Sequence, residues 1–390
     1  MAQRTVYFAT NRIPIARGNR PTQREDIVGF GAELGPINGI AVRYGSIDIE
    51  VDLTKGNADD GAAIVAGSLS VAPEQLVGSP SFRAPVLGSH TIFDAVRTTM
   101  MTDRKPTLAF IHGFSNEFDS AASRAGWVGE LYASRGLDMT MFMFTWPSRQ
   151  SLSLGPLPYV DYEHDRGTAA ASGLAIARTL RTLQSYVDRL AKEQHCEQPL
   201  HLLCHSMGNY VLRHAVQALL RTPDPAANPG TGAELAFIDR ADPDPATLRR
   251  IFDQIVLAAA DDDDDGFDDP QKLKFLPRIG GGVAVYHTGA DWVLSTLSRN
   301  TKFNGPRLGN DGPDNMSNIS DKVSAIDVSD VLPAGRDVQH HQYYRANPLV
   351  ADDIVAVLRG VRPGAIAGRV PTAEGRWHLD ATISARPIGG

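Results

Sequence analysis

The sequence predicts an α/β fold: a mostly parallel sheet with helices on both faces and an antiparallel extension at its N-terminal edge. Three observations carry this prediction. From about residue 91 onward, short apolar runs typical of buried strands alternate with segments whose apolar residues recur at helical spacing. Such alternation produces βαβ units, which form parallel sheets covered on both faces. Two closely spaced strand patterns precede them, and no internal repeat or clean linker divides the chain.

Residues 1–90 are expected to form a strand extension that packs on the core. Strand patterns cover residues 3–12 and 38–53, the second with the period-two alternation of a half-buried strand. The Gly/Pro-rich segment between them is expected to be a connection. Residues 54–90 contain turn residues and no strong periodicity, so we predict an irregular segment there.

Residues 91–360 are expected to form the central domain. Its predicted strands are continuous apolar runs at 107–111, 139–145, 200–204, 254–260, 282–287 and 323–328. Its predicted helices cover 91–101, 119–134, 168–193, 209–220 and 349–359. The longest helix has one apolar stripe, formed by Ile176, Leu180, Leu183, Val187 and Leu190. Residues 361–390 are expected to form a C-terminal tail with turn residues and a single strand pattern.

Composition limits the class of protein. The chain has 390 residues, 42% of them hydrophobic, and a net charge of −7, which argues against nucleic acid or an anionic membrane as the main partner. No apolar run approaches the ~18 residues of a membrane helix, and the N-terminus lacks a signal-peptide pattern. Cys196 and Cys204 form neither a disulfide framework nor a zinc pattern. We expect a cytoplasmic protein with a small-molecule substrate and neither metal nor cofactor; no feature indicates an oligomeric state.

The stretch from Leu200 to Leu220 carries the strongest chemical signal. Apolar strand residues lead through Cys204-His-Ser-Met-Gly208 into a helical pattern. A serine at such a junction matches the nucleophile elbow G-x-S-x-G, whose sharp turn presents the hydroxyl above the sheet edge. Cys204 replaces the first glycine and Gly208 is kept, so Ser206 is the candidate nucleophile. The alternative is an ordinary strand-turn-helix junction with a chance serine.

A serine nucleophile needs a base within hydrogen-bond reach, and that base is held by an acid. In hydrolases with a nucleophile elbow the chain order is serine, acid, histidine. His340 and His341 stand where this order places the base, before the last helix. The alternative for this pair is a solvated surface position. His205, beside the serine, is expected to point away on the tight turn.

Two aspartates compete for the role of the acid. Asp291 follows the predicted strand at 282–287 in a loop from which it can reach the base. Asp261 follows the preceding strand and begins an acidic run that extends to Asp269. Both stand at carboxyl ends of predicted strands, where the chemistry of open α/β sheets gathers.

The first residues of the acidic run 261–269 also match the start of a calcium-binding EF-hand loop. Asp261, Asp263, Asp265 and Gly266 match that start, but Lys272 occupies the position that requires a glutamate. A strand rather than a helix precedes the run. We therefore expect a solvated acidic loop.

An oxyanion site and an apolar pocket complete the prediction. The oxyanion would be held by the backbone N–H groups of Met207 and Phe114, the latter in the loop after the strand at 107–111. His112-Gly113 gives this loop the freedom to turn an amide inward. Candidates for the walls of the substrate pocket are His112, Phe114, Trp146, Tyr159, Tyr162 and Trp292. Any of these aromatic side chains can instead belong to the core.

Motifs spread over most of the chain resemble a bacterial family of uncharacterised α/β hydrolases, known as domain of unknown function 900. They are Tyr7–Arg12, Phe110–Asn116, Phe144–Ser148, Tyr162–Arg166, Cys204–Asn209, Leu257–Asp261, Asp291–Ser295, Arg307–Gly309 and His341–Tyr344. The resemblance implies an α/β-hydrolase fold with residues 91–360 as the catalytic domain. It also implies Ser206 as nucleophile, Asp291 as acid and His341 as base, with Asp261 and His340 as the alternatives. The chain departs from the family at Cys204, more often Ala or Gly, and at His340, where Gly is usual.

These observations predict a serine hydrolase that cleaves carboxylic esters or thioesters through an acyl-enzyme. An acyltransferase that discharges the same acyl-enzyme to an alcohol or amine is the first alternative. A catalytically idle hydrolase fold used for binding is the second, which the intact serine, aspartate and histidine argue against. The Pro/Asp/Gly-rich segment 222–245 is expected to be a solvent loop rather than a flap over the site.

Overall fold

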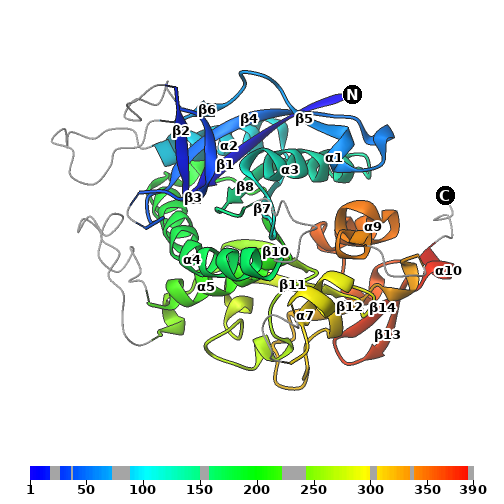
Figure 1. Ribbon diagram of the computed structural model, residues 1–390. Coiled ribbons are helices and arrows are strands. Elements are labelled where there is room, and N and C mark those ends of the chain that lie inside the picture. The colour runs from blue at the N-terminus through cyan, green and yellow to red at the C-terminus, as the bar shows by residue number, and fades with distance from the viewer. Residues whose placement is uncertain are drawn as a thin grey trace.

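A central sheet organises the molecule (Figure 1). The computed structural model describes residues 1–17, 27–36, 38–72, 88–149, 158–221, 243–298, 305–333 and 338–384. Within these ranges, 12 strands form one sheet in the order β13-β14-β12-β11-β10-β9-β7-β8-β1-β4-β5, with β6 paired to β4. Neighbouring strands are parallel from β14 through to β1, and antiparallel pairs stand at both edges. This arrangement confirms the predicted mostly parallel sheet.

The central strands of the sheet have five to eight residues. They are β7 Thr107–Ile111, β8 Thr140–Thr145, β9 Leu200–His205, β10 Phe252–Ala258, β11 Gly280–His287 and β12 Val323–Asp327. Those toward the edges are β1 Ala2–Thr10, β4 Arg43–Val51, β5 Ala62–Ile64, β6 Ser70–Val71, β13 Arg369–Ala373 and β14 Arg376–Leu379. All six predicted central strands are present, with ends within two residues of the prediction.

Helices cover both faces of the sheet, as the alternating sequence pattern predicts (Figure 1). One face packs against α2 Gly88–Asp103, α4 Pro158–Arg189 and α5 Met207–Arg221. The other packs against α3 Phe118–Ala133 and α9 Pro348–Leu358. Short helices are α1 Ala58–Gly61, α7 Leu308–Asp311, α8 Tyr343–Ala346 and α10 Ala381–Ser384. No helix within the described ranges is both long and apolar enough for a membrane crossing.

The structure differs from the sequence prediction mainly outside the central strands. The segment expected as a connection contains a hairpin of β2 Arg12–Ala16 and β3 Ile27–Leu34. Residues 54–72, expected to be irregular, contain α1, β5 and β6. Helix α4 begins ten residues before the predicted 168, within a segment expected to be a loop.

Both outer segments of the chain contribute strands to the central sheet. Strand β1 is itself parallel to β8, so the antiparallel addition at this edge begins at β4. Residues 361–390, expected as a tail, contain the β13–β14 hairpin, and β14 pairs in parallel with β12. Of the segment 222–245, residues 222–242 lie outside the described residues.

Candidate active site

Ser206 stands at the turn between β9 and α5, at the carboxyl end of the sheet. Its φ angle is +53°, a left-handed conformation that is uncommon for a residue with a side chain. Hydrogen bonds hold the turn against β10: the Ser206 N–H donates to Ala258 O at 3.0 Å, and the Asp261 N–H donates to Ser206 O at 3.2 Å. The strained residue thus lies at the helix N-terminus, where positive partial charge favours an anion.

Two glycines allow the backbones around Ser206 to approach one another. A Cβ atom on Gly208 would lie 2.6 Å from the carbonyl oxygens of Ile111 and His112. A Cβ atom on Gly113 would lie 2.7 Å from the Cβ of Ser206. Cys204, in place of the first glycine of the elbow, is fully buried, and burial raises the pKa of its thiol well above 9. Close packing therefore explains why the second glycine of the motif is present.

His341 and Asp291 form a buried hydrogen-bonded pair. The distance from His341 Nδ1 to Asp291 Oδ2 is 2.7 Å, and Asp291 Oδ1 accepts from the Leu294 N–H at 3.0 Å. Because a carboxylate accepts, the His341 proton lies on Nδ1, and Nε2 is left as the basic nitrogen. His341 and Ser206 line the same cavity, which has a volume of about 190 Å³.

Neighbouring segments hold the backbone around His341. Tyr343 Oη donates to Tyr286 O at 2.7 Å and accepts from the Ala259 N–H at 2.6 Å. His205 Nε2 lies 2.8 Å from His341 O, and a carbonyl only accepts, so His205 donates. Burial first, and then the proximity of the His341 imidazole, lower the pKa of His205 well below 6.5, so this imidazole is neutral. His205 therefore points toward the base, contrary to the sequence prediction that it points away.

His340 differs from His341 in its hydrogen bonds and in its position relative to the cavity. Its side chain is buried, and neither ring nitrogen has a hydrogen-bond partner in the described part of the chain. It is not among the residues that line the cavity of Ser206. Of the two adjacent histidines, His341 is the one that meets Asp291.

Arg12 holds the loop after β7 in place through hydrogen bonds. This arginine is buried and donates to Asn116 O at 2.6 Å and to Thr145 Oγ1 at 2.9 Å. Burial lowers its pKa to about 9, so it is charged at neutral pH. The Asn116 side chain donates to Gly113 O at 3.0 Å and to Phe114 O at 2.8 Å. The loop that carries the Phe114 amide is therefore well ordered.

The residues predicted as pocket walls divide into two groups. Phe114 and Tyr162 line the cavity of Ser206. His112 and Trp146 do not: both are buried, their rings stack at 5.3 Å, and Trp146 Nε1 donates to His112 O at 2.9 Å. They belong to the support of the loop after β7.

Two further predicted residues, Trp292 and Met207, do not line the cavity, and the side chain of a third, Tyr159, is not among the described residues. Trp292 is 40% exposed and does not line the cavity, whereas the next residues, Val293 and Leu294, do. Met207 is buried at the first position of α5. Tyr159 lies in α4, and its side chain is outside the described residues.

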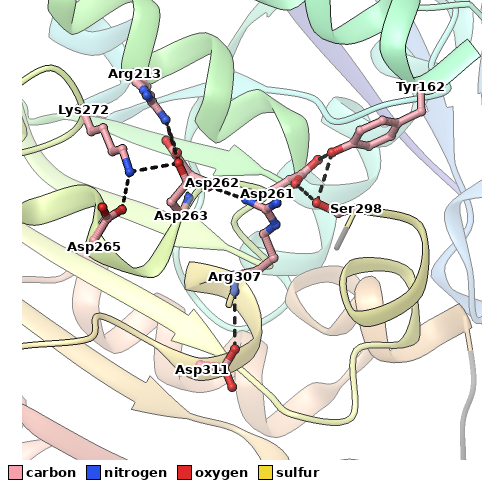
Figure 2. Close-up of polar contacts among 10 residues, drawn as sticks. All are labelled: Tyr162, Arg213, Asp261, Asp262, Asp263, Asp265, Lys272, Ser298, Arg307 and Asp311. Carbon is pink, nitrogen blue, oxygen red and sulfur yellow. Dashed lines mark hydrogen bonds and ion pairs between the residues drawn. The ribbon is translucent and has the colours of Figure 1, made fainter. Parts of the chain in front are cut away.

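Asp261 lines the cavity and forms a buried network with Tyr162 and Ser298 (Figure 2). Tyr162 Oη donates to Asp261 Oδ2 at 2.5 Å, and Ser298 Oγ donates to Asp261 Oδ1. Burial, with the charge of Asp261, raises the pKa of Tyr162 well above 10, so this phenol remains a donor. No contact of Asp261 with His341 is among the hydrogen bonds of the described residues, which separates it from the Asp291–His341 pair.

The acidic run after β10 is paired with basic side chains rather than solvated, as Figure 2 shows. Asp261 and Asp262 are buried. Arg213 Nη1 lies 2.8 Å from Asp262 Oδ1, and Lys272 Nζ lies 3.0 Å from Asp263 Oδ2. Buried Arg307 also pairs with Asp263. The expectation of a solvated loop is therefore wrong for Asp262 and Asp263, because helix α5 and the segments at 272 and 307 bring cations to these two carboxylates.

A family model and solved structures match the chain. The model of a family described as α/β hydrolases of unknown function (domain of unknown function 900) matches residues 92–362. The catalytic core domain of acetyl xylan esterase from Trichoderma reesei is 12% identical and covers 66% of this chain and 98% of its own, with a TM-score of 0.32. An iodinated complex of acetyl xylan esterase is 13% identical and covers 66% of this chain and 97% of its own, with a TM-score of 0.31. No curated protein matches the chain.

Proposed function

This chain belongs to the family of α/β hydrolases of unknown function, and from that premise we propose that it is a serine hydrolase of carboxylic esters or thioesters. The observation that carries the proposal is the 2.7 Å hydrogen bond between Asp291 and His341, together with Ser206 and His341 in one cavity. Ser206, Asp291 and His341 would act as nucleophile, acid and base, in the chain order that hydrolases of this fold have.

The proposed reaction begins with proton transfer from Ser206 Oγ to His341 Nε2. The serine oxygen attacks the acyl carbon, and Asp291 stabilises the imidazolium through Nδ1–H. The backbone amides of Phe114 and Met207 would hold the oxyanion. His341 then gives its proton to the leaving alcohol or thiol, and an acyl-enzyme on Ser206 remains. Water, deprotonated by His341, releases the acid and restores the serine.

The surroundings of Ser206 support this chemistry on energetic grounds. The N-terminus of α5 and its amides favour negative charge beside the nucleophile. The Arg12–Asn116 contacts order the loop of Phe114 before substrate arrives, so that little reorganisation is needed during the reaction. The volume of about 190 Å³ suits a short acyl group.

Hydrolysis of p-nitrophenyl acyl esters of increasing chain length tests the proposal. We expect Ser206→Ala and His341→Ala to lower kcat/KM by about 10⁴-fold or more. His340→Gln is the matched control, because it alters the adjacent histidine that does not contact Asp291, and it should retain activity. Activity retained in Ser206→Ala would overturn the proposal. A wild type that hydrolyses no ester would favour the alternative of a catalytically idle fold used for binding. Products formed with added alcohols or amines separate hydrolysis from acyl transfer.

A further inference from the structure

The cavity of Ser206 has a cationic wall that the proposed reaction does not use. Arg124, from helix α3, lines this cavity together with Ser206 and His341. Its side chain is 18% exposed, so most of it is shielded from solvent. Its Nη1 donates to Asn116 Oδ1, and its buried Nε has no hydrogen-bond partner among the described residues.

Arg124 shares the carboxylate of Asp59 with a second arginine, Arg345, which does not line the cavity. Arg345 lies close by and is 6% exposed. Both arginines approach the single carboxylate of Asp59, Arg124 at 3.4 Å and Arg345 at 3.9 Å, and that carboxylate is 65% exposed. Long, solvent-exposed ion pairs of this kind contribute little. Burial and then the charge of Arg345 lower the pKa of Arg124, in keeping with two cations that share a weak counter-ion.

Arg124 lies near the reacting groups, because it lines one cavity with Ser206 and His341. Burial and the proximity of His341 are the main causes of the low pKa of His205, and the charges of Arg345 and Arg124 lower it further. Asp261 lines the same cavity, and its carboxylate accepts hydrogen bonds from Tyr162 and Ser298 (Figure 2). The carboxylate of Asp261 is thus occupied by protein donors, whereas the guanidinium of Arg124 has Asn116 and the exposed Asp59 as its side-chain acceptors.

We propose that Arg124 selects short acyl esters that carry a second, anionic group, a carboxylate, on the acyl chain. The inference rests on the proposed function: the ester carbonyl lies at Ser206 and the carboxylate is held by the guanidinium of Arg124. Arginine suits this role because its planar donors match a carboxylate, and such charge-assisted hydrogen bonds are about twice as strong as neutral ones. The cavity of about 190 Å³ holds roughly six water volumes of ~30 Å³, the size of a short dicarboxylic monoester.

A matched pair of esters isolates the charge. Monomethyl adipate and dimethyl adipate differ only in one methyl group and the carboxylate it masks, and both release methanol. In the wild type, kcat/KM should be about 10-fold or more higher for the monoester. The ratio should fall toward 1 in Arg124→Met and lie between these values in Arg124→Lys. Arg135→Met is the control: it removes one charge just after α3, from a residue outside the cavity lining.

The ratio separates recognition from loop support. Arg124 also contacts Asn116, so its loss is expected to lower the hydrolysis of both esters, but a purely structural role would leave their ratio unchanged. The wild type provides a measurement that needs no variant, since added salt should reduce the preference for the monoester. A wild-type ratio at or below 1, or the same ratio in a folded Arg124→Met protein, would overturn the inference.

Labelling of Ser206 by a fluorophosphonate in the same preparations distinguishes the two proposals. A labelled enzyme that shows no preference for the monoester contradicts only the role of Arg124. An unlabelled enzyme that hydrolyses neither ester contradicts the serine-hydrolase proposal, and the role of Arg124 with it.

Discussion

At the scale of single residues, two carboxylates at the ends of adjacent strands have different hydrogen bonds. Asp291 accepts from His341, whereas the oxygens of Asp261 accept from Tyr162 and Ser298. Asp291→Asn is expected to lower kcat by about 10³- to 10⁴-fold, because the amide no longer fixes the productive tautomer. Asp261→Asn should cost far less. Steady-state hydrolysis of one ester by both variants measures the two losses of kcat. A larger loss in Asp261→Asn than in Asp291→Asn would assign the role of the acid to Asp261.

His205 is the residue whose contribution to the site is most easily overlooked. It donates to His341 O, and its ring lies 4.8 Å from the ring of the base. His205→Phe removes the donor, so we expect His341 to shift and kcat to fall by about 10- to 100-fold with little change in KM. His205→Gln, which can still donate, should recover part of the loss. Equal losses in both variants would contradict a positioning role.

The sequence alone predicts Ser206 as the candidate nucleophile, because the strand, the turn, Gly208 and the helix all lie in one short stretch. It leaves the acid open between Asp261 and Asp291, since both follow strands. The hydrogen bond from His205 to the carbonyl of His341 could not be predicted from the sequence, because its two residues are 136 positions apart and no local pattern brings them together.

At the scale of elements, the junction of β9 and α5 depends on a close contact with the loop after β7. Gly208→Ala would place a Cβ 2.6 Å from two carbonyl oxygens. We expect it to lower the free energy of unfolding by about 1–3 kcal/mol and to abolish most of the activity. Gly167→Ala in α4 is the control, because an added Cβ would meet no described atom within 4 Å beyond its chain neighbours and the backbone of its own helix, and alanine favours a helix. Urea unfolding of both variants checks this, and equal stabilities would contradict it.

Helices and strands could be predicted from the sequence where a single hydrophobic pattern extends over the whole element. The central strands are continuous apolar runs, and their burial on both faces explains that composition. The β2–β3 hairpin escapes prediction because β2 is an edge strand with Pro14 at its centre and Ile13 and Ile15 exposed. The early start of α4 is hidden by its polar first turns, which contain Asp165 as a buried acceptor for Ser148.

At the scale of the whole molecule, buried histidines make stability depend on pH. Burial lowers the pKa of His112, His201, His205, His214 and His287. For His201 the pKa falls from 6.5 to about 4. The unfolded chain therefore binds protons below about pH 6.5 that the folded chain does not, and the free energy of unfolding decreases as pH falls from 6.5 toward 4.

His201→Leu tests this dependence at a site away from the chemistry. The His201 side chain is fully buried, and neither ring nitrogen has a partner within the described residues, so leucine removes an unsatisfied group. We expect the free energy of unfolding to fall less steeply with acid, by about 1 kcal/mol per pH unit between pH 6 and 5. His195→Gln, at an exposed position, is the control. Equal slopes in His201→Leu and wild type would contradict the assignment.

The edges of the sheet show why the overall architecture was harder to predict than its centre. Strand β14 joins β12 through pairs such as Ile326 with Trp377, although a long stretch of chain separates them. Arg369 lies buried against Asp353 of α9, which ties the C-terminal hairpin to the core. Short strands held by such distant partners carry little periodicity of their own, so they resemble a tail in the sequence.

The measurement that tests the central claim most directly is mass spectrometry of the protein after reaction with a fluorophosphonate. An activated serine predicts one adduct, on the peptide that contains Ser206, absent in Ser206→Ala and formed much more slowly in His341→Ala. His340→Gln should label at the wild-type rate. A rate of labelling that is unaffected by His341→Ala, or an adduct on another residue, would contradict the serine-hydrolase account.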